Sequence, residues 1–465
     1  MFRITKRWWL FFLTAIAITY FVLAFHNLLL PGVYYDELLQ VLPALSAAGY
    51  NVGDEFYQVP RSIIHFGNIR LPLMIMPYTG PFETFIFTPL FFVLPPTVTV
   101  LRSTFIFLGI ITIAFTFFAT REVFGLYAAI IASLLLATDA GYIFYSRADI
   151  GPINTMMIIK TLMLLTLTLW WRSGKRYWFY VGAFLGGLGI YDKANFVWLL
   201  IAGGLVISVF GFKELMERLR HRWKMLFVGS LIFLIGAGPF IVYVLLSGGG
   251  PFKSFIANFE NTGLGINNLN IMQNLGRRAI SLWGLLNGYL CQIEYTSCFS
   301  CSTDHGIVSE RWFVLQPYAL LLAVAAPILL YLRQRILIVH LKIILGLAIL
   351  ISLILLLSIF TPTTLSNNHL LLIYPFPHIL IAYAAVLIWS PIESPIQNAQ
   401  THITRASISK TSRIMRGAVT LVILLTLIGN FLATIHVHRA LETTGGIGMW
   451  SSAIYELNDY LESQN

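Results

Sequence analysis

Long apolar runs recur along the whole chain, each close to the length of a membrane span and separated by polar or basic stretches. About 20 apolar residues let a helix cross the hydrocarbon core of a bilayer, and basic residues concentrate in cytoplasmic loops. The pattern therefore predicts an all-α polytopic membrane protein with about 11 transmembrane helices. They are expected near residues 8–30, 99–120, 125–145, 151–171, 225–247, 313–331, 336–360, 369–388 and 417–435, with a hairpin between Arg176 and 212 whose tip lies at 191–195.

Two connections are too long to be simple turns. Residues 31–98 are rich in proline and partly amphipathic, which predicts a first external loop of short interfacial helices. Residues 248–312 form the second long external loop in the same topology. Residues 1–436 are thus one transmembrane domain, and 437–465 form an external tail with a short amphipathic helix.

The start of the chain sets the orientation. Arg3, Lys6 and Arg7 precede the first apolar run, which favours a cytoplasmic N-terminus. That run is too long for the core of a signal peptide and lacks a small-residue cleavage site, so we expect it to be a retained span.

Composition agrees with this interpretation. The chain is 57% hydrophobic and 11% charged, whereas a soluble domain carries roughly 25% charged residues. The net charge of +10 is attributed to Lys and Arg in cytoplasmic loops and not to nucleic-acid binding.

Three cysteines, Cys291, Cys298 and Cys301, lie together in the second long loop. One disulfide with one remaining thiol suits an oxidising compartment, and three free thiols are the alternative. A zinc site would need a fourth ligand, for which His305 is the neighbouring candidate. The sequence leaves these three states open.

The predicted topology brings polar residues from distant segments to one membrane face. They are Asp36 and Glu37 in the first loop, Arg147, Asp149 and Asn154 at the second external turn, Asp192, Lys193 and Asn195 at the third, and Asn367, Asn368, His369 and Tyr374 at the tenth span. Ionisable groups embedded at spans are costly and mark functional sites by default. A carboxylate there can act as a general base, and nearby basic groups can hold a phosphate leaving group.

Each group also has a purely structural interpretation. Asp36 and Glu37 suit the start of a helix, and Arg147 and Asp149 suit an ion pair at a turn. Lys193 can extend to the lipid headgroups, and His369 can be an ordinary interfacial histidine. His65 and Arg70 are expected at the surface of the first loop.

Four stretches carry a family resemblance. They are "YYDELLQVLPALSAAGY", "YSRADIGPINTMMI", "GLGIYDKANFVWLL" and "NHLLLIYPFPHILIA", and "MPYTGPFETFIFTPLFFVLPPTVTVLRST" matches the approach to the second span. Together, over about residues 8–390, they resemble GT-C-type glycosyltransferases, in the branch of the protein O-mannosyltransferases and the lipid A aminoarabinose transferases.

The resemblance implies inverting transfer of a sugar from a polyprenyl-phosphate carrier to a lipid, glycan or protein acceptor on the extracytoplasmic face of the plasma or inner membrane. It implies Asp36 as the base, Glu37 as its structural or substrate-binding partner and Asp149 as a second acid. Lys193 and His369 are implied as phosphate contacts, and the other implied substrate-binding residues are Arg147, Tyr374, Tyr35 and Arg70. The late motif has Asn368 and His369 where many relatives have arginine or tyrosine, so the resemblance gives less support to phosphate binding there. No late external loop is long enough for the folded domain of protein O-mannosyltransferases, so a lipid or glycan acceptor is favoured over protein.

Two further questions stay open in the sequence. Asp36, Asp149 and either His65 or His369 are suitable ligands for a divalent cation, but their spacing does not require one, so no metal or other cofactor is assigned. The alternative function is a transporter or flippase of lipid-linked glycans, although such proteins tend to show paired halves with midplane charges. A non-catalytic scaffold would leave the clustered acids unexplained.

Overall fold

A computed structural model gives the fold. It describes residues 8–52, 59, 62–67, 69–220, 222–260, 269–288, 290, 314–333, 336–360, 367–389, 410–446 and 451–463. The three cysteines and His305 lie outside these residues.

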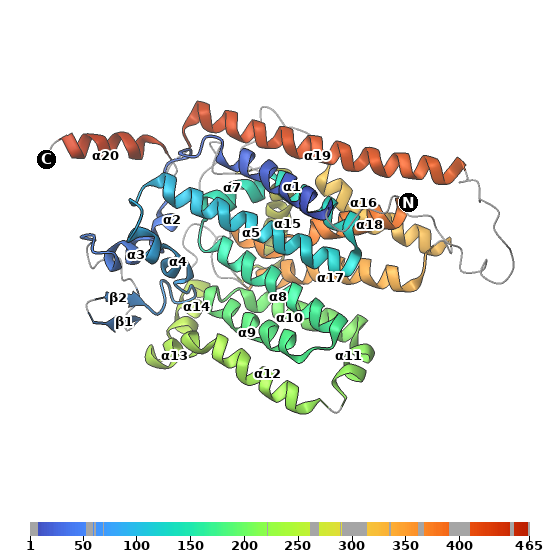
Figure 1. The fold of residues 1–465 in the computed structure, drawn as a ribbon, viewed down its shortest axis with the longest axis horizontal. Coiled ribbons are helices and arrows are strands. Elements are labelled where there is room, and N and C mark those ends of the chain that lie inside the picture. The colour runs from blue at the N-terminus through green and yellow to red at the C-terminus, as the bar shows by residue number, and fades with distance from the viewer. Residues whose placement is uncertain are drawn as a thin grey trace.

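Helices account for nearly all regular structure (Figure 1). In chain order they are α1 (Trp8–Phe25), α2 (Tyr35–Leu39), α3 (Leu42–Ala47), α4 (Phe82–Phe91), α5 (Val98–Phe124), α6 (Leu126–Thr138), α7 (Ala140–Ala148), α8 (Ile153–Ser173), α9 (Arg176–Asp192), α10 (Phe196–Phe210), α11 (Phe212–Leu219), α12 (Trp223–Gly236), α13 (Gly238–Leu246), α14 (Gly250–Glu260), α15 (Ile271–Leu286), α16 (Gln316–Leu332), α17 (Ile338–Ser358), η3 (Asn367–Ile373, a 3-10 helix), α18 (Phe376–Trp389), α19 (Lys410–Thr444) and α20 (Ala453–Ser463).

The prediction of a polytopic helical membrane protein is confirmed. Among the described residues, five helices are each long and apolar enough to cross a bilayer, and three further pairs qualify as bent spans. Every expected span coincides with a helix or a bent pair, and the expected hairpin tip falls between α9 and α10. In Figure 1 the long helices lie roughly parallel, and α2, α3, α4 and the strands gather at one end of the bundle, here called the site end.

Two of the expected spans are broken helices. The span expected at 125–145 is broken: α6 and α7 meet at 65°, and Asp139 at the break accepts a hydrogen bond from Tyr142 N (2.8 Å) that caps α7. α12 and α13 meet at 59°, next to Pro239 in the first turn of α13. Proline lacks an N–H and cannot continue the preceding helix, whereas hydropathy alone does not show such a break.

The first long loop contains the expected short helices and also a hairpin that the sequence pattern did not reveal. Strands β1 (Ile63–Phe66) and β2 (Ile69–Pro72) pair antiparallel, with Ile63 opposite Pro72. The following turn pairs with the end of α9: Gly80 N donates to Asp192 O and Ala194 N donates to Tyr78 O, both at 2.9 Å. These bonds fix the loop against the bundle.

Late in the chain, the tenth span begins with η3 and continues as α18, so its first turns are tighter than an α-helix. The last span, α19, has 35 residues and exceeds the expected range. The tail forms the expected short helix α20, which extends beyond the bundle at the site end in Figure 1.

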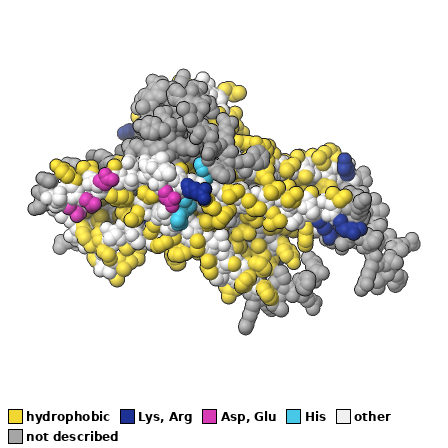
Figure 2. All heavy atoms as spheres, turned by 90° about the horizontal axis from the view of Figure 1, so that it is seen from above, with side chains coloured by type: hydrophobic (Ala, Val, Ile, Leu, Met, Phe, Trp, Pro, Cys, Tyr) yellow, Lys and Arg dark blue, Asp and Glu magenta, His cyan; other side chains and the backbone are white. Residues whose placement is uncertain are grey.

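The outer surface of the bundle is largely hydrophobic, as Figure 2 shows for the face bearing α19. Charged side chains on this face are concentrated in a few places, including the end where α19 begins and the helix α20. A surface of this kind matches contact with lipid along the spans and with water at their ends.

Candidate functional site

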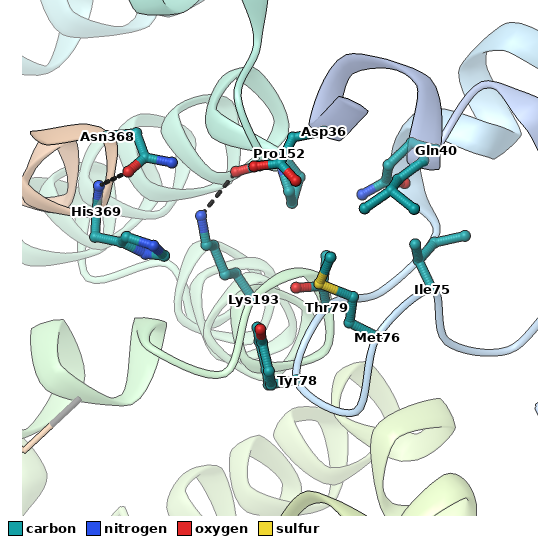
Figure 3. Close-up of a pocket in the computed structure, with 12 residues that line it drawn as sticks. Asp36, Gln40, Ile75, Met76, Tyr78, Thr79, Pro152, Lys193, Asn368 and His369 are labelled. Carbon is teal, nitrogen blue, oxygen red and sulfur yellow. Dashed lines mark hydrogen bonds between the residues drawn. The ribbon is translucent and has the colours of Figure 1, made fainter. Parts of the chain in front are cut away.

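A cavity opens at the site end between the first loop and three bundle segments (Figure 3). Its walls come from α2, the turn before α4, the turn between α7 and α8, the end of α9 and η3. The lining residues are Asp36, Leu39, Gln40, Ile75, Met76, Tyr78, Thr79, Gly151, Pro152, Lys193, Asn368 and His369.

Asp36 lies in the first turn of α2 and contributes the acid of the cavity. Burial raises the pKa of its carboxyl, and the neighbouring Glu37 adds to this while Lys193 opposes it. Within the described part of the chain its carboxylate is not held by a hydrogen bond. Asp36 is therefore a carboxylate of increased basicity that faces an open space.

Lys193 contributes the cation. It follows the last residue of α9, and its Nζ donates to Gly151 O at 2.7 Å. Figure 3 shows its side chain pointing between His369 and Asp36. Its burial lowers the pKa of the ammonium, and the surrounding acids Asp36 and Asp192 counteract this. The side chain is 4% exposed, so it does not extend to the lipid headgroups.

His369 and Asn368 form the opposite wall on η3. The Asn368 carboxamide accepts from His369 N at 2.9 Å and donates to Ile150 O at 2.9 Å. His369 Nδ1 is buried and has no hydrogen-bond partner among the described residues. The imidazole lines the cavity and can form a hydrogen bond with a group bound there.

Glu37 points away from the cavity although it follows Asp36 directly. Both of its carboxylate oxygens accept from Arg102 of α5, at 2.9 Å and 3.0 Å, and neither side chain is exposed. Glu37 Oε1 also accepts from Tyr34 N at 3.0 Å, which closes the first turn of α2. Of the two roles expected for Glu37, structural or substrate-binding, this position fits the structural one.

Arg147 is also a support residue in this geometry. Its guanidinium donates to the carbonyl of Ala24 in the last turn of α1 and to those of His26 (2.7 Å) and Leu30 just beyond it. It is 1% exposed, does not line the cavity and forms no ion pair with Asp149. Arg102 binds the next carbonyls, Leu28, Pro31 and Gly32. Two buried arginines therefore hold the segment that leads to Asp36.

Asp149 lies directly behind the cavity wall. Its φ of +43° ends α7, and its Oδ1 accepts from Ile153 N and Asn154 N at 2.8 and 2.9 Å at the start of α8. Asp tolerates this left-handed conformation better than most residues. Asp149 thus shapes the turn whose Gly151 and Pro152 line the cavity.

Two more acids, Glu83 and Asp192, are buried beside Asp149. Glu83 comes from α4, and burial and Asp149 raise its pKa well above its usual range. Asp192 Oδ1 accepts from the Thr155 hydroxyl at 2.8 Å. Glu83, Asp149 and Asp192 surround the single ammonium of Lys193. Because three buried carboxylates would repel one another, at least one of these acids keeps its proton.

Tyr374 is fully buried outside the cavity. Its hydroxyl donates to Asp139 Oδ2 at 3.1 Å, and the same oxygen lies 3.0 Å from His378 Nε2 and accepts from Gln316 Nε2 at 2.5 Å. This network joins the α6–α7 break to α16 and α18.

The remaining predicted site residues lie outside the cavity. Tyr35 is exposed on α2, and His65 and Arg70 are exposed partners across the hairpin. Of the polar residues singled out in the sequence, the structure brings together Asp36, Lys193, Asn368 and His369.

Several residues of the site and its supports were missed from the sequence. Gln40, Tyr78 and Thr79 lie in a loop whose fold depends on tertiary contacts and left no local signal. Arg102 and Lys160, in contrast, are charges inside apolar spans, which is a recognisable sign. Among the described residues, no group of three or more His, Cys, Asp or Glu side chains is arranged to hold a metal ion.

The comparisons with known proteins agree with this architecture. Residues 79–243 match the family model described as dolichyl-phosphate-mannose-protein mannosyltransferase. The resemblance to GT-C-type glycosyltransferases is confirmed. The match covers Thr79, the Asp149 turn and Lys193. No curated protein sequence matches the chain.

Solved structures show the same fold at low sequence identity. ArnT from Cupriavidus metallidurans, bound to undecaprenyl phosphate, is 15% identical with a TM-score of 0.53, and the match covers 95% of this chain and 78% of that one. The archaeal oligosaccharyltransferase AglB from Archaeoglobus fulgidus, in complex with an inhibitory peptide and a dolichol-phosphate, is 13% identical with a TM-score of 0.50. That match covers 94% of this chain and 56% of AglB, which is considerably longer.

Proposed function

We propose that this protein transfers a sugar from a polyprenyl-phosphate carrier to an acceptor, with inversion at the anomeric carbon. The observation that carries the proposal is the cavity in which Asp36 faces Lys193 and His369. A base opposite two groups suited to phosphate is what such a displacement requires. The family match over residues 79–243 supports the same reaction class.

Asp36 is the proposed general base. Its carboxylate takes the proton from an acceptor hydroxyl or amine as that atom forms its bond to the anomeric carbon. The raised pKa of Asp36 improves its strength as a base, because proton-transfer driving force grows with basicity. Its free oxygens leave room for the acceptor to approach.

Lys193 and His369 are the proposed phosphate contacts. As the bond between the anomeric carbon and the phosphate oxygen breaks, the electron pair leaves with the phosphate, which gains one negative charge. The Lys193 ammonium stabilises that charge, and the His369 imidazole supplies a hydrogen bond. Nothing in the proposed step requires a metal ion.

The donor and the location follow from the membrane setting. The donor's lipid chain remains in the bilayer while its phosphate reaches the cavity at the end of the spans. ArnT and AglB have been solved with such lipid phosphates, which supports this class of donor. We place the site on the extracytoplasmic face of the plasma or inner membrane, with a lipid or glycan favoured over protein as acceptor.

The test is the variant Asp36→Asn in the purified full chain. We expect transfer from a polyprenyl-phosphate sugar to fall by about 10³-fold, since general acid–base catalysis contributes roughly 10²–10⁴. Binding of undecaprenyl phosphate should be retained. The matched control is Asp459→Asn on the exposed helix α20, which removes an acid far from the cavity and should leave transfer unchanged. Full turnover by Asp36→Asn would exclude Asp36 as the base.

One observation favours the alternative of a lipid-linked glycan transporter. The α6–α7 span is broken at the buried Asp139, and broken helices beside buried charges are common in transporters. Proteoliposomes discriminate the two functions. A protein that moves the lipid-linked sugar across the bilayer and forms no glycoside is a transporter.

A further inference from the structure

Lys160 is a buried lysine without an acidic partner among the described residues. It lies in the second turn of α8, and it is fully buried. No carboxylate in the described part of the chain forms an ion pair with it. Its Nζ instead donates to two backbone carbonyls, Leu371 O at 3.0 Å and Leu372 O at 2.9 Å.

A buried lysine in this position is costly. Taking such a side chain out of water is unfavourable, and a methionine of similar length would avoid that cost. What methionine cannot supply is a pair of directed hydrogen bonds to two successive carbonyls. The role of Lys160 therefore depends on the segment that contains these two carbonyls.

They belong to η3, the 3-10 helix that carries the far wall of the cavity. Short 3-10 helices have poor hydrogen-bond geometry and need tertiary support. The first turn of η3 holds Asn368 and His369, which line the cavity, and its last turn holds the two carbonyls bound by Lys160. Lys160 thus fixes the end of η3 opposite to the cavity residues.

The same helix, α8, also controls the other wall. Its first residues are capped by Asp149, and the turn before it presents Gly151, whose carbonyl binds Lys193. One rigid element therefore sets the position of Lys193 and, through Lys160, the position of η3. A hydrogen bond from the Asn368 side chain to Ile150 O connects the two walls next to the cavity.

We propose that Lys160 is a positioning residue that holds His369 opposite Lys193, so that both can contact one phosphate group. The proposal rests on the proposed function in that it assigns this phosphate to the lipid-linked donor. Lys160 does not line the cavity and acts only through η3.

A double-mutant cycle tests the proposal with undecaprenyl phosphate as the probe in the purified full chain. Lys160→Met and His369→Ala should each weaken binding by about tenfold, and the double variant should be no weaker than His369→Ala alone, since residues acting through one element are not additive. Multiplying effects, or wild-type affinity in Lys160→Met, would overturn the proposal. Thr161→Val on the same helix is the control and should bind normally.

A second measurement needs no ligand. Hydrogen exchange of the amides in 367–374 should accelerate in Lys160→Met, while exchange in α5 stays as in the wild type. Lys160→Gln keeps an N–H donor without the charge and should show a smaller increase. Unchanged exchange of 367–374 in Lys160→Met would contradict the proposal.

The outcomes also separate this inference from the proposed function. Protein that binds undecaprenyl phosphate with the predicted coupling but transfers no sugar refutes the transferase and keeps the role of Lys160. Protein that transfers sugar with no coupling between Lys160 and His369 refutes the positioning role alone.

Discussion

Glu37 and Arg102 form a two-point ion pair, with distances of 2.9 and 3.0 Å, between the first loop and α5. The two acids are adjacent in the sequence but have different surroundings. Glu37 is paired with Arg102, whereas Asp36 faces the cavity. Arg102 also binds the carbonyls of Leu28, Pro31 and Gly32, so one side chain organises the whole approach to Asp36.

The first prediction concerns this pair. Arg102→Met should lower the free energy of unfolding by about 3–5 kcal/mol, because it leaves the Glu37 carboxylate buried and unpaired. Adding Glu37→Gln should recover part of the loss, since the buried charge is then gone. Thermal unfolding in detergent measures both effects. A single variant as stable as the wild type would show that the pair is dispensable.

The second prediction concerns the pH dependence of transfer. Asp36 must be ionised to act as base, and its pKa is raised, so the acid limb of kcat/KM should lie above the ordinary value of 3.8. Lys193 must be protonated to hold phosphate, and its pKa is lowered, so the alkaline limb should lie below 10.5. Lys193→Arg keeps its charge at any accessible pH and should remove the alkaline limb. An alkaline limb that persists unchanged in this variant would assign it to another group.

The third prediction concerns Glu83 and stability. Its pKa is raised well above 4.5 by burial and Asp149, so the folded state binds a proton that the unfolded state releases at lower pH. Folding stability is then lost as pH rises from the unfolded value through the folded one. Glu83→Gln cannot ionise and should unfold at a higher temperature than the wild type at alkaline pH, with the difference vanishing in acid. The opposite trend would show that Glu83 is ionised in the folded protein.

The fourth prediction concerns the contact between the first loop and α9. A Cβ at Gly80 would lie against the backbone carbonyl of Tyr191, whereas a Cβ at Gly203 in α10 would meet open space. Gly80→Ala should displace the loop and reduce transfer by about tenfold, because small misplacements at a reaction centre are costly. Gly203→Ala is the matched control and should be neutral or slightly stabilising. Equal activity of the two variants would mean that the loop can shift without harm.

Much of the fold could be predicted from the sequence because hydrophobic length and basic loops are local signals. The spans, the turn at 149–152 and the hairpin tip before Phe196 all follow from them. The breaks at Asp139 and Gly238 could not be predicted in this way, since an apolar run looks the same whether the helix is straight or bent. The strands β1 and β2 were missed for a related reason, because a short edge hairpin is stabilised by its turn and neighbours more than by its pattern.

The candidate site, too, could be predicted only in part from the sequence. The sequence by itself determined which ionisable residues are unusual for a membrane protein, and Asp36, Lys193 and His369 were found in this way. Only the tertiary structure decided which of them share a space and which are used to hold the fold. Glu37, Arg147 and Tyr374 are equally unusual in the sequence, but each is bound by partners more than 60 residues away: Arg102, the carbonyls after α1, and Asp139. A buried charge must find its partner wherever the fold provides one, and that partner is not encoded in the neighbouring sequence.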